Sequence, residues 1–148
     1  MIRQSLTELF ERDLNKLKEE FNLYSDESKM WVLKGEIKNS AGNLALHLLG
    51  NLNHFIGAIL GNSGYVRNRD AEFSEKDIPR NEIISNIDKT IGVIKSTLSK
   101  ISDEDLGKDY PVKVLKDKVT MKTEFFLIHL LGHLNYHLGQ INYHRRLI

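Results

Sequence analysis

The chain has 148 residues and a formal net charge of +1, because 21 Lys and Arg face 20 Asp and Glu. This length suits one domain with a sizeable core, and the balanced charge gives no electrostatic case for nucleic-acid binding. The absence of cysteine excludes thiolate metal ligands, disulfides and a cysteine nucleophile. The charged N-terminal stretch lacks the apolar run of a signal peptide, and no segment has the apolar length of a membrane span, so we expect a cytoplasmic protein without a membrane partner.

Apolar spacing predicts four long helices and few strands. The first helix is expected over residues 2–22, where apolar side chains recur at intervals of three and four: Leu6, Phe10, Leu14, Leu17 and Phe21. A connector over residues 25–38 follows, and Ser40 is the predicted N-cap of a second helix over residues 41–60.

Two long connections separate the remaining helices. Residues 61–79 are polar and are expected to form a crossover loop, after which Pro79 suits the first turn of a third helix that runs to about Ile101. Residues 102–120 form the second connection, in which Val112, Val114 and Val119 allow a short extended piece. The fourth helix is expected over residues 121–146. No repeat or linker divides the chain, so residues 1–148 are predicted to form one all-α domain.

Histidines gather on one face of the predicted fourth helix. At about 100° per residue, a stripe about 80° wide contains His129, His133, His137, Gln140 and His144. A single histidine on such a face is usually a satisfied core or boundary residue. Imidazole is also the commonest neutral metal ligand, and an i, i+4 pair can aim two ring nitrogens at one point. This segment by itself leaves core packing and metal binding open.

The predicted second helix carries a similar polar stripe, formed by His47, Asn51 and His54. A ligand from this helix would complete a three-residue set with two ligands from the fourth helix. Glycines lie seven residues apart on both helices: Gly50 and Gly57, and Gly132 and Gly139. Since an interior glycine costs about 0.5–1 kcal/mol relative to alanine, we expect close backbone approach or room for a ligand there, the alternative being chance glycines in a marginal helix.

These motifs resemble the DinB-like (YfiT-like) superfamily of bacterial metalloproteins over essentially the whole chain. The most specific parts are His47 with the following LLGNL, the tract RNRDAEF at residues 67–73, and HLLGHLNYHLGQI at residues 129–141, and they are similar to an uncharacterised branch. The resemblance implies a four-helix bundle of variant up-and-down topology that holds a divalent metal between helices. It also implies three metal ligands, which here are His47, His133 and His137.

One position departs from the family pattern, and one histidine is ambiguous. Leu138 stands where the commoner pattern has arginine, which we interpret as a change beside the site. His129 and His133 have the same spacing as His133 and His137, but the Gly139-Gln140 pair after His137 favours the latter two as ligands. His129 is then either a residue that supports the ligands or a core histidine.

Other polar residues have two interpretations each. Asn51 and His54 either orient ligands or substrate, or lie on the helix surface. Gln140 is expected to form hydrogen bonds near the site. Tyr136 and Tyr143 either direct a hydroxyl group toward the site or are core aromatics with one polar atom.

The tract at residues 67–73 carries Arg67, Arg69, Asp70 and Glu72. Its arginines either bind an anionic substrate or form ion pairs with the neighbouring carboxylates, and the ion pairs are the preferred interpretation. His144 needs no function, because a cation suits the C-terminal end of a helix.

The expected function is that of a metal-dependent enzyme with a small-molecule substrate. Zinc or nickel suits the site best, with iron or copper as further options. The reaction is either metal-assisted hydrolysis or transfer of a low-molecular-weight thiol, and the resemblance favours the thiol-dependent transferase. No catalytic residue is identified. The alternatives are a non-catalytic metal-binding protein and a helical interaction module. A homodimer is expected through surplus apolar residues such as Ile83, Ile91 and Ile94.

Overall fold

The computed structural model describes residues 1–114, 116 and 120–148, and this part of the chain is all-helical. Its long elements are α1 (Ile2–Leu23), α2 (Ala41–Leu52), α4 (Arg80–Lys100) and α6 (Thr123–Leu147), and η2 (Asn53–Leu60) continues α2 as a π-helix. Its short elements are η1 (Glu27–Trp31), α3 (Arg69–Ser74) and α5 (Asp103–Leu106). The prediction of an all-α chain is therefore confirmed for the described residues.

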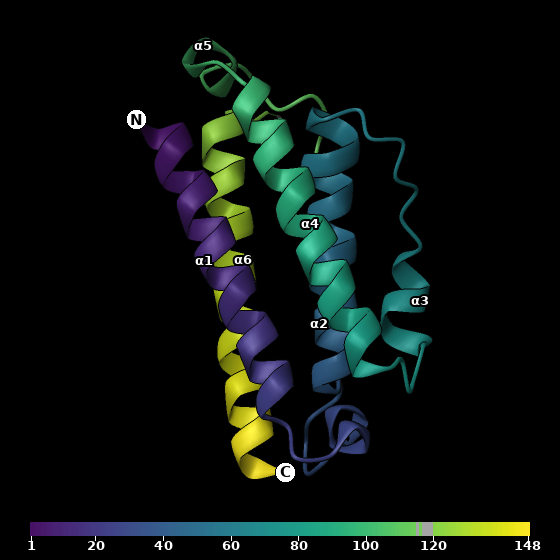
Figure 1. Ribbon diagram of the computed structural model, residues 1–148. Coiled ribbons are helices and arrows are strands. Elements are labelled where there is room, and N and C mark those ends of the chain that lie inside the picture. The colour runs from purple at the N-terminus through teal and green to yellow at the C-terminus, as the bar shows by residue number, and fades with distance from the viewer. Residues whose placement is uncertain (115, 117–119) are drawn as a thin grey trace.

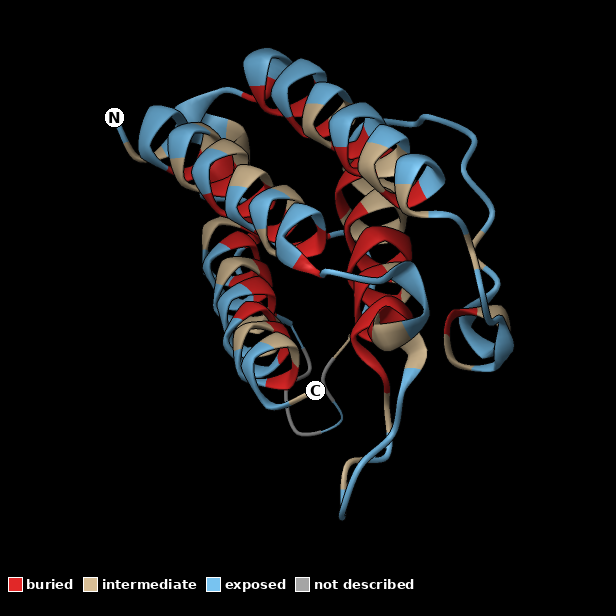
Figure 2. Cartoon of the chain, turned by 60° about the horizontal axis from the view of Figure 1, so that its bottom comes forward, coloured by how far each residue is buried: buried red, intermediate tan, exposed pale blue. Residues whose placement is uncertain are grey.

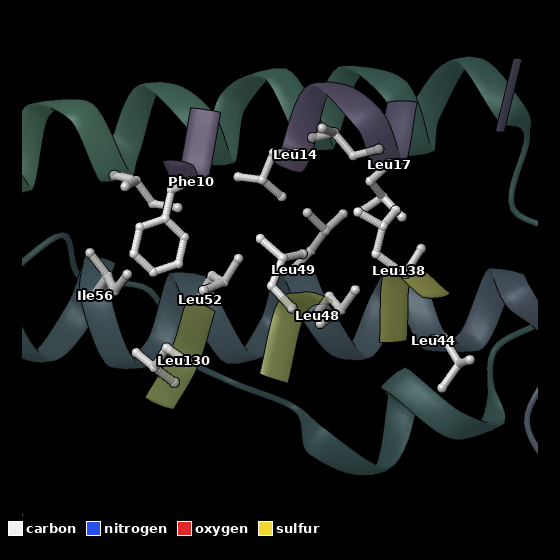
Figure 3. Packing of buried hydrophobic residues seen from close by; sticks show 14 of the residues in the cluster. Phe10, Leu14, Leu17, Leu44, Leu48, Leu49, Leu52, Ile56, Leu130 and Leu138 are labelled. Carbon is white, nitrogen blue, oxygen red and sulfur yellow. The ribbon is translucent and has the colours of Figure 1, made fainter. Parts of the chain in front are cut away.

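The four long helical segments enclose one apolar core. Each of α1 and α2 packs against both α4 and α6, as Figure 1 shows. The buried faces of these helices turn toward one another, whereas the outer faces are exposed (Figure 2). Phe10 and Leu14 of α1 point toward Leu49 and Leu52 of α2 in the centre of this core (Figure 3). The apolar spacing that predicted the first helix therefore corresponds to its core face.

The second helix begins as predicted but changes type along its length. The Ser40 hydroxyl accepts a hydrogen bond from the Asn43 backbone N–H, which is the expected N-cap. From Asn53 onward the helix widens into η2, and the Gly61 N–H donates to the Ile56 carbonyl five residues earlier. The Asn53 amide donates to the Leu49 carbonyl and to the Thr90 hydroxyl of α4. The extent of the predicted helix is thus correct, but its last eight residues form a π-helix.

The predicted crossover loop contains a short helix, α3, which corrects the expectation of a connection without helices. The Asn68 side chain caps α3 by accepting a hydrogen bond from the Ala71 N–H. The Asn43 amide of α2 donates to the carbonyls of Glu72 and Glu75, at 2.9 Å each, and so attaches α3 to α2. A helix of six residues is too short for an apolar period to reveal it.

The second connection also differs from the expectation. It holds α5, which begins with a capping box between Ser102 and Asp105. No extended strand forms at Val112 and Val114 within the described residues, and Val119 lies outside them. Extended pairing occurs instead as an isolated bridge between Asp109 and Lys122, just before α6.

Glycines on the second and fourth helices have different roles. A Cβ atom on Gly50 would lie 2.0 Å from Glu72 Oε2, and one on Gly57 would lie 3.0 Å from the Val93 side chain. No heavy atom lies within 4 Å of a Cβ built on Gly132 or Gly139. Close approach is therefore present at the second helix, where it involves side chains of other elements, and is absent at Gly132 and Gly139, which face open space.

Two of the three isoleucines named as surplus belong to the core of this chain. Ile83 and Ile94 are buried against the other helices, whereas Ile91 is only partly buried at the edge of the core. The exposed apolar side chains gather mainly on α6 instead: Phe125, Ile128, Tyr136, Tyr143 and Leu147. Within the described residues, no helix combines the length and apolar character that a bilayer crossing requires.

Candidate metal centre

Three histidine side chains from two helices converge between α2 and α6. His47 Nε2 lies 3.1 Å from His133 Nε2, which in turn lies 3.1 Å from His137 Nε2. Three potential ligand nitrogens, one from each ring, lie within 4.8 Å of one another. Nitrogen ligands about 2.0–2.1 Å from one tetrahedral zinc ion are separated by about 3.3 Å. The structure therefore brings the three expected residues to a spacing that suits one small ion.

The opposite ring nitrogens have unequal surroundings. His47 Nδ1 lies 3.0 Å from Glu72 Oε1, and His137 Nδ1 lies 2.7 Å from Gln140 Oε1. Because both oxygens accept hydrogen bonds, they favour a proton on each Nδ1 and leave the Nε2 lone pair directed at the centre. His133 Nδ1 is buried and has no hydrogen-bond partner among the described residues.

Glu72 is the residue that sequence reasoning did not place at the centre. Arg67 donates to both of its carboxylate oxygens, at 2.8 Å each, and the Glu72 side chain is 6% exposed. Gly50 makes room for this carboxylate, because any larger side chain would collide with it. The ion pair expected for Arg67 is therefore present, and its carboxylate also fixes the ring of His47. The only sequence signal was the acidic residue five positions after Arg67, on an element whose packing against α2 could not be predicted.

Burial keeps two of the histidines neutral. It lowers the pKa of His47, although the hydrogen bond and charge of Glu72 act in the opposite direction. Burial also lowers the pKa of His133 to about 4, with smaller contributions from the charges of His137, His47, His129 and Arg67. Neutral imidazole is the form that binds metal, so both rings are ready to act as ligands at pH 7.

His129 and His54 lie outside the three-histidine cluster. His129 is exposed and stacks on Phe126, with ring centroids 5.9 Å apart and an interplanar angle of 15°. His54 packs edge-on against Phe55 at 4.7 Å. Neither residue is a buried core histidine. Among the described residues, the group of possible metal ligands includes neither His129 nor His54.

The remaining polar candidates divide into those near the cluster and those at the surface. Gln140 forms the expected hydrogen bond, and Asn51 is buried with its Oδ1 unpaired among the described residues. Tyr136 and Tyr143 are 67% and 70% exposed, so their interpretation as core aromatics is wrong. The Tyr136 ring lies 5.3 Å from that of His137.

Two residues of the sequence stripes have structural settings of their own. Buried His144 pairs with the Tyr24 hydroxyl at 2.6 Å and with the Val32 carbonyl at 2.8 Å, so hydrogen bonding explains it better than the helix dipole. Arg69 stands over the Phe73 ring at 5.3 Å, and among the described residues the ion pairs do not include one between Arg69 and Asp70. The ion-pair interpretation of the tract therefore holds for Arg67 but not for Arg69.

The fold and the site define an all-helical protein with a three-histidine cluster between two of its helices. The chain belongs to the family described as "Protein of unknown function (DUF1572)", whose sequence profile matches residues 3–148. It is similar to the structure titled "Crystal structure of the conserved protein of locus from Enterococcus faecalis", with a TM-score of 0.76 and 16% identity over 98% of this chain and 95% of that chain. That likeness shows a shared fold. No curated protein matches the chain.

Proposed function

We propose that this protein is a metal-dependent enzyme in which His47, His133 and His137 hold one divalent ion. The observation that carries this proposal is the convergence of three Nε2 atoms, with Glu72 and Gln140 fixing two of the rings from behind. We also propose that the fold is a DinB-like four-helix bundle of variant up-and-down topology. The matching order of ligands along the chain, one from α2 and two from α6, supports that classification.

The donor set suits zinc or nickel first, with iron and copper as further options. Three neutral imidazoles leave the full dication charge in place and leave coordination positions for water or substrate. When bound, the ion supplies Lewis acidity, which activates either water for hydrolysis or a low-molecular-weight thiol for transfer to an electrophile.

Thiol transfer is the preferred reaction. Hydrolysis requires a base beside the attacking water, and the nearest carboxylate, Glu72, already accepts hydrogen bonds from Arg67 and pairs with His47. Among the described residues, no second carboxylate forms a hydrogen bond or an ion pair with the cluster. A thiol loses its proton far more readily than water, so its transfer depends less on a positioned base.

A non-catalytic metal-binding protein is the second candidate. The polar groups beside the cluster support it, because Glu72 and Gln140 each form a hydrogen bond with a ligand ring. The two candidates differ in water access: a catalytic ion exchanges water, whereas a structural ion is fully coordinated by protein and its removal unfolds the chain. Water-proton relaxation of the protein loaded with a paramagnetic divalent ion separates them.

Metal content tests the proposal directly. We expect about one equivalent of a transition metal per chain when untagged protein, purified without chelators or added metal, is analysed by mass spectrometry. A content near zero, together with no uptake of zinc or nickel on titration, would contradict both metal-binding candidates and leave the histidines as packing residues.

We also propose that the protein is a homodimer, through the exposed apolar face of α6 and not through α4. Tyr136 and Tyr143 lie two turns apart on this face, and a Cβ on Gly139 between them meets open space. Light scattering after size-exclusion chromatography should give the mass of two chains. The double substitution Tyr136→Glu and Tyr143→Glu should give the mass of one, and a monomeric native protein would refute this proposal.

A further inference from the structure

A cavity of about 280 Å³ opens directly beside the three-histidine cluster. His133 and His47 form part of its wall, and further residues come from α2, η2, the start of α3 and α6, with Arg67 and Val114 from the connecting segments. At about 30 Å³ per water-sized group, it has room for a ligand of about ten non-hydrogen atoms.

Among the described residues, one positive charge in the cavity wall has no carboxylate in ion-pair contact. Arg67 is neutralised by its two hydrogen bonds to Glu72. Arg69 has no carboxylate in ion-pair contact among the described residues, and its guanidinium is held over the Phe73 ring. Phe73 in turn packs against His47, with ring centroids 4.9 Å apart. An aromatic stack therefore holds a cation close to the cluster, and no described residue accepts a hydrogen bond from its guanidinium.

Asn51 supplies an unpaired hydrogen-bonding group in the same wall. Asn51 is 8% exposed, and its Oδ1 has no hydrogen-bond partner among the described residues. A buried amide without a partner destabilises a folded protein unless a ligand or water pairs with it. Because an amide can present either its carbonyl or its N–H groups, Asn51 can pair with a carboxyl group or with a neighbouring donor of one ligand.

Another part of the wall is aromatic. Phe55 and Phe126 meet edge-to-face, with centroids 5.2 Å apart and an interplanar angle of 89°. His129 stacks on Phe126 and lines the same cavity. These rings suit the flat apolar portion of a ligand, whereas the arginine side suits a negative charge.

We propose that this cavity binds a small, partly apolar carboxylic acid, with Arg69 facing the carboxylate, Asn51 hydrogen-bonding the same molecule, and Phe55 and Phe126 flanking its apolar part. The inference rests on the proposed function in one respect: the acid is the substrate that the three-histidine site acts on. Binding of the acid itself does not require the ion, because the charge of Arg69 and the Asn51 amide belong to the chain.

Benzoate and benzamide form a matched pair of probes, since they share shape and differ in charge. The metal-free protein is titrated with each by isothermal calorimetry or by chemical-shift changes of backbone amides. Benzoate should bind at least about fivefold more tightly than benzamide, which corresponds to one partly solvated ion pair. Arg69→Gln should abolish this preference. Arg146→Gln is the matched control, because Arg146 also stands over an aromatic ring, that of Tyr143 at 5.4 Å, but far along α6 from the cavity.

Asn51→Leu gives a second, independent readout. It should weaken benzoate binding at least about threefold and raise the Tm of the metal-free protein by about 2 °C or more, because a buried amide oxygen without a partner among the described residues is removed. If Asn51 had only a structural role, Asn51→Leu would lower the stability of the protein. Circular dichroism confirms that each variant is folded before its affinity is compared.

Several results would overturn the inference. One is that benzoate and benzamide bind with equal affinity, and another is that neither binds up to about 20 mM. A third is that Arg69→Gln leaves the affinity for benzoate unchanged. Benzoate binding only to zinc-loaded protein, insensitive to Arg69→Gln, would indicate simple ligation to the ion and would also overturn it. The main titration uses metal-free protein, so it tests the anion site alone. The metal analysis tests the metal centre, and a negative result in one experiment does not imply a negative result in the other.

Discussion

At the scale of single residues, the two imidazoles of α6 that belong to the cluster lie one turn apart, and His129 lies one turn before them. His133 and His137 approach His47, whereas His129 faces Phe126. We expect His137→Ala to weaken zinc binding at least about 100-fold, since two remaining ligands cannot complete a site. His129→Ala should leave zinc affinity within about threefold of the native value.

Competition with a chromophoric chelator measures both affinities, and helix content by circular dichroism serves as the control for folding. The opposite pattern, with zinc retained by His137→Ala and lost by His129→Ala, would move the site by one turn of α6.

Glu72 links the metal centre to the stability of the fold. Glu72→Gln should lower zinc affinity about 10–100-fold, because the amide orients the His47 ring less strongly than a carboxylate does. It should also destabilise the protein by about 3–5 kcal/mol, since Arg67 loses its partner in a setting where the two side chains are 13% and 6% exposed. Chelator competition and urea unfolding measure the two effects.

Arg67→Met is the matched control for Glu72→Gln. It breaks the same ion pair but keeps the contact between Glu72 and His47, so stability should fall while zinc affinity changes little. Equal losses of zinc affinity in both variants would show that Glu72 supports the fold without orienting His47.

At the scale of helices, each of α2 and α6 carries two glycines seven residues apart, but replacing a glycine by alanine should have opposite effects on stability in the two helices. Gly132→Ala on α6 should stabilise the protein by about 0.5–1 kcal/mol, because the new methyl group meets no heavy atom within 4 Å. Gly50→Ala on α2 should destabilise it and lower zinc affinity, because its Cβ would lie 2.0 Å from Glu72 Oε2 and must displace that carboxylate. Urea midpoints of the two variants, measured without metal, check the signs, and a stabilising Gly50→Ala would contradict the close approach.

At the scale of the whole molecule, burial of the histidines makes stability depend on pH. The pKa of His133 is about 4 in the folded protein and that of His47 is also lowered, whereas an unfolded histidine titrates near pH 6.5. Below about pH 6.5 the unfolded chain therefore binds protons that the folded chain does not. The stabilisation from these neutral rings is complete above about pH 6.5 and declines as the pH falls toward about 4.

Urea midpoints of metal-free protein between about pH 7 and about pH 5 test this expectation, since most carboxylates titrate below that window. The midpoint should fall with pH, and His133→Gln should flatten the decline. A midpoint that stays constant or rises on acidification would contradict the burial of neutral imidazoles.

The sequence by itself determined the four long helices and which histidines share a face, because a period of 3.6 residues is a local property. Local hydrogen bonding explains why Ser40 begins α2 as predicted. The same reasoning did not show that the helix widens at Asn53, because the partner of its amide, Thr90, lies on another helix.

Only the tertiary structure decided what surrounds the histidines. Glu72 reaches His47 because α3 packs on α2, Gly132 faces open space, and Arg69 stands over Phe73 without a carboxylate partner among the described residues. Each of these depends on contacts between segments far apart in the chain, which apolar spacing does not encode. The sequence thus determined which imidazoles lie together on each helix, and long-range packing decided which residues pair with them and what kind of ligand the adjoining cavity suits.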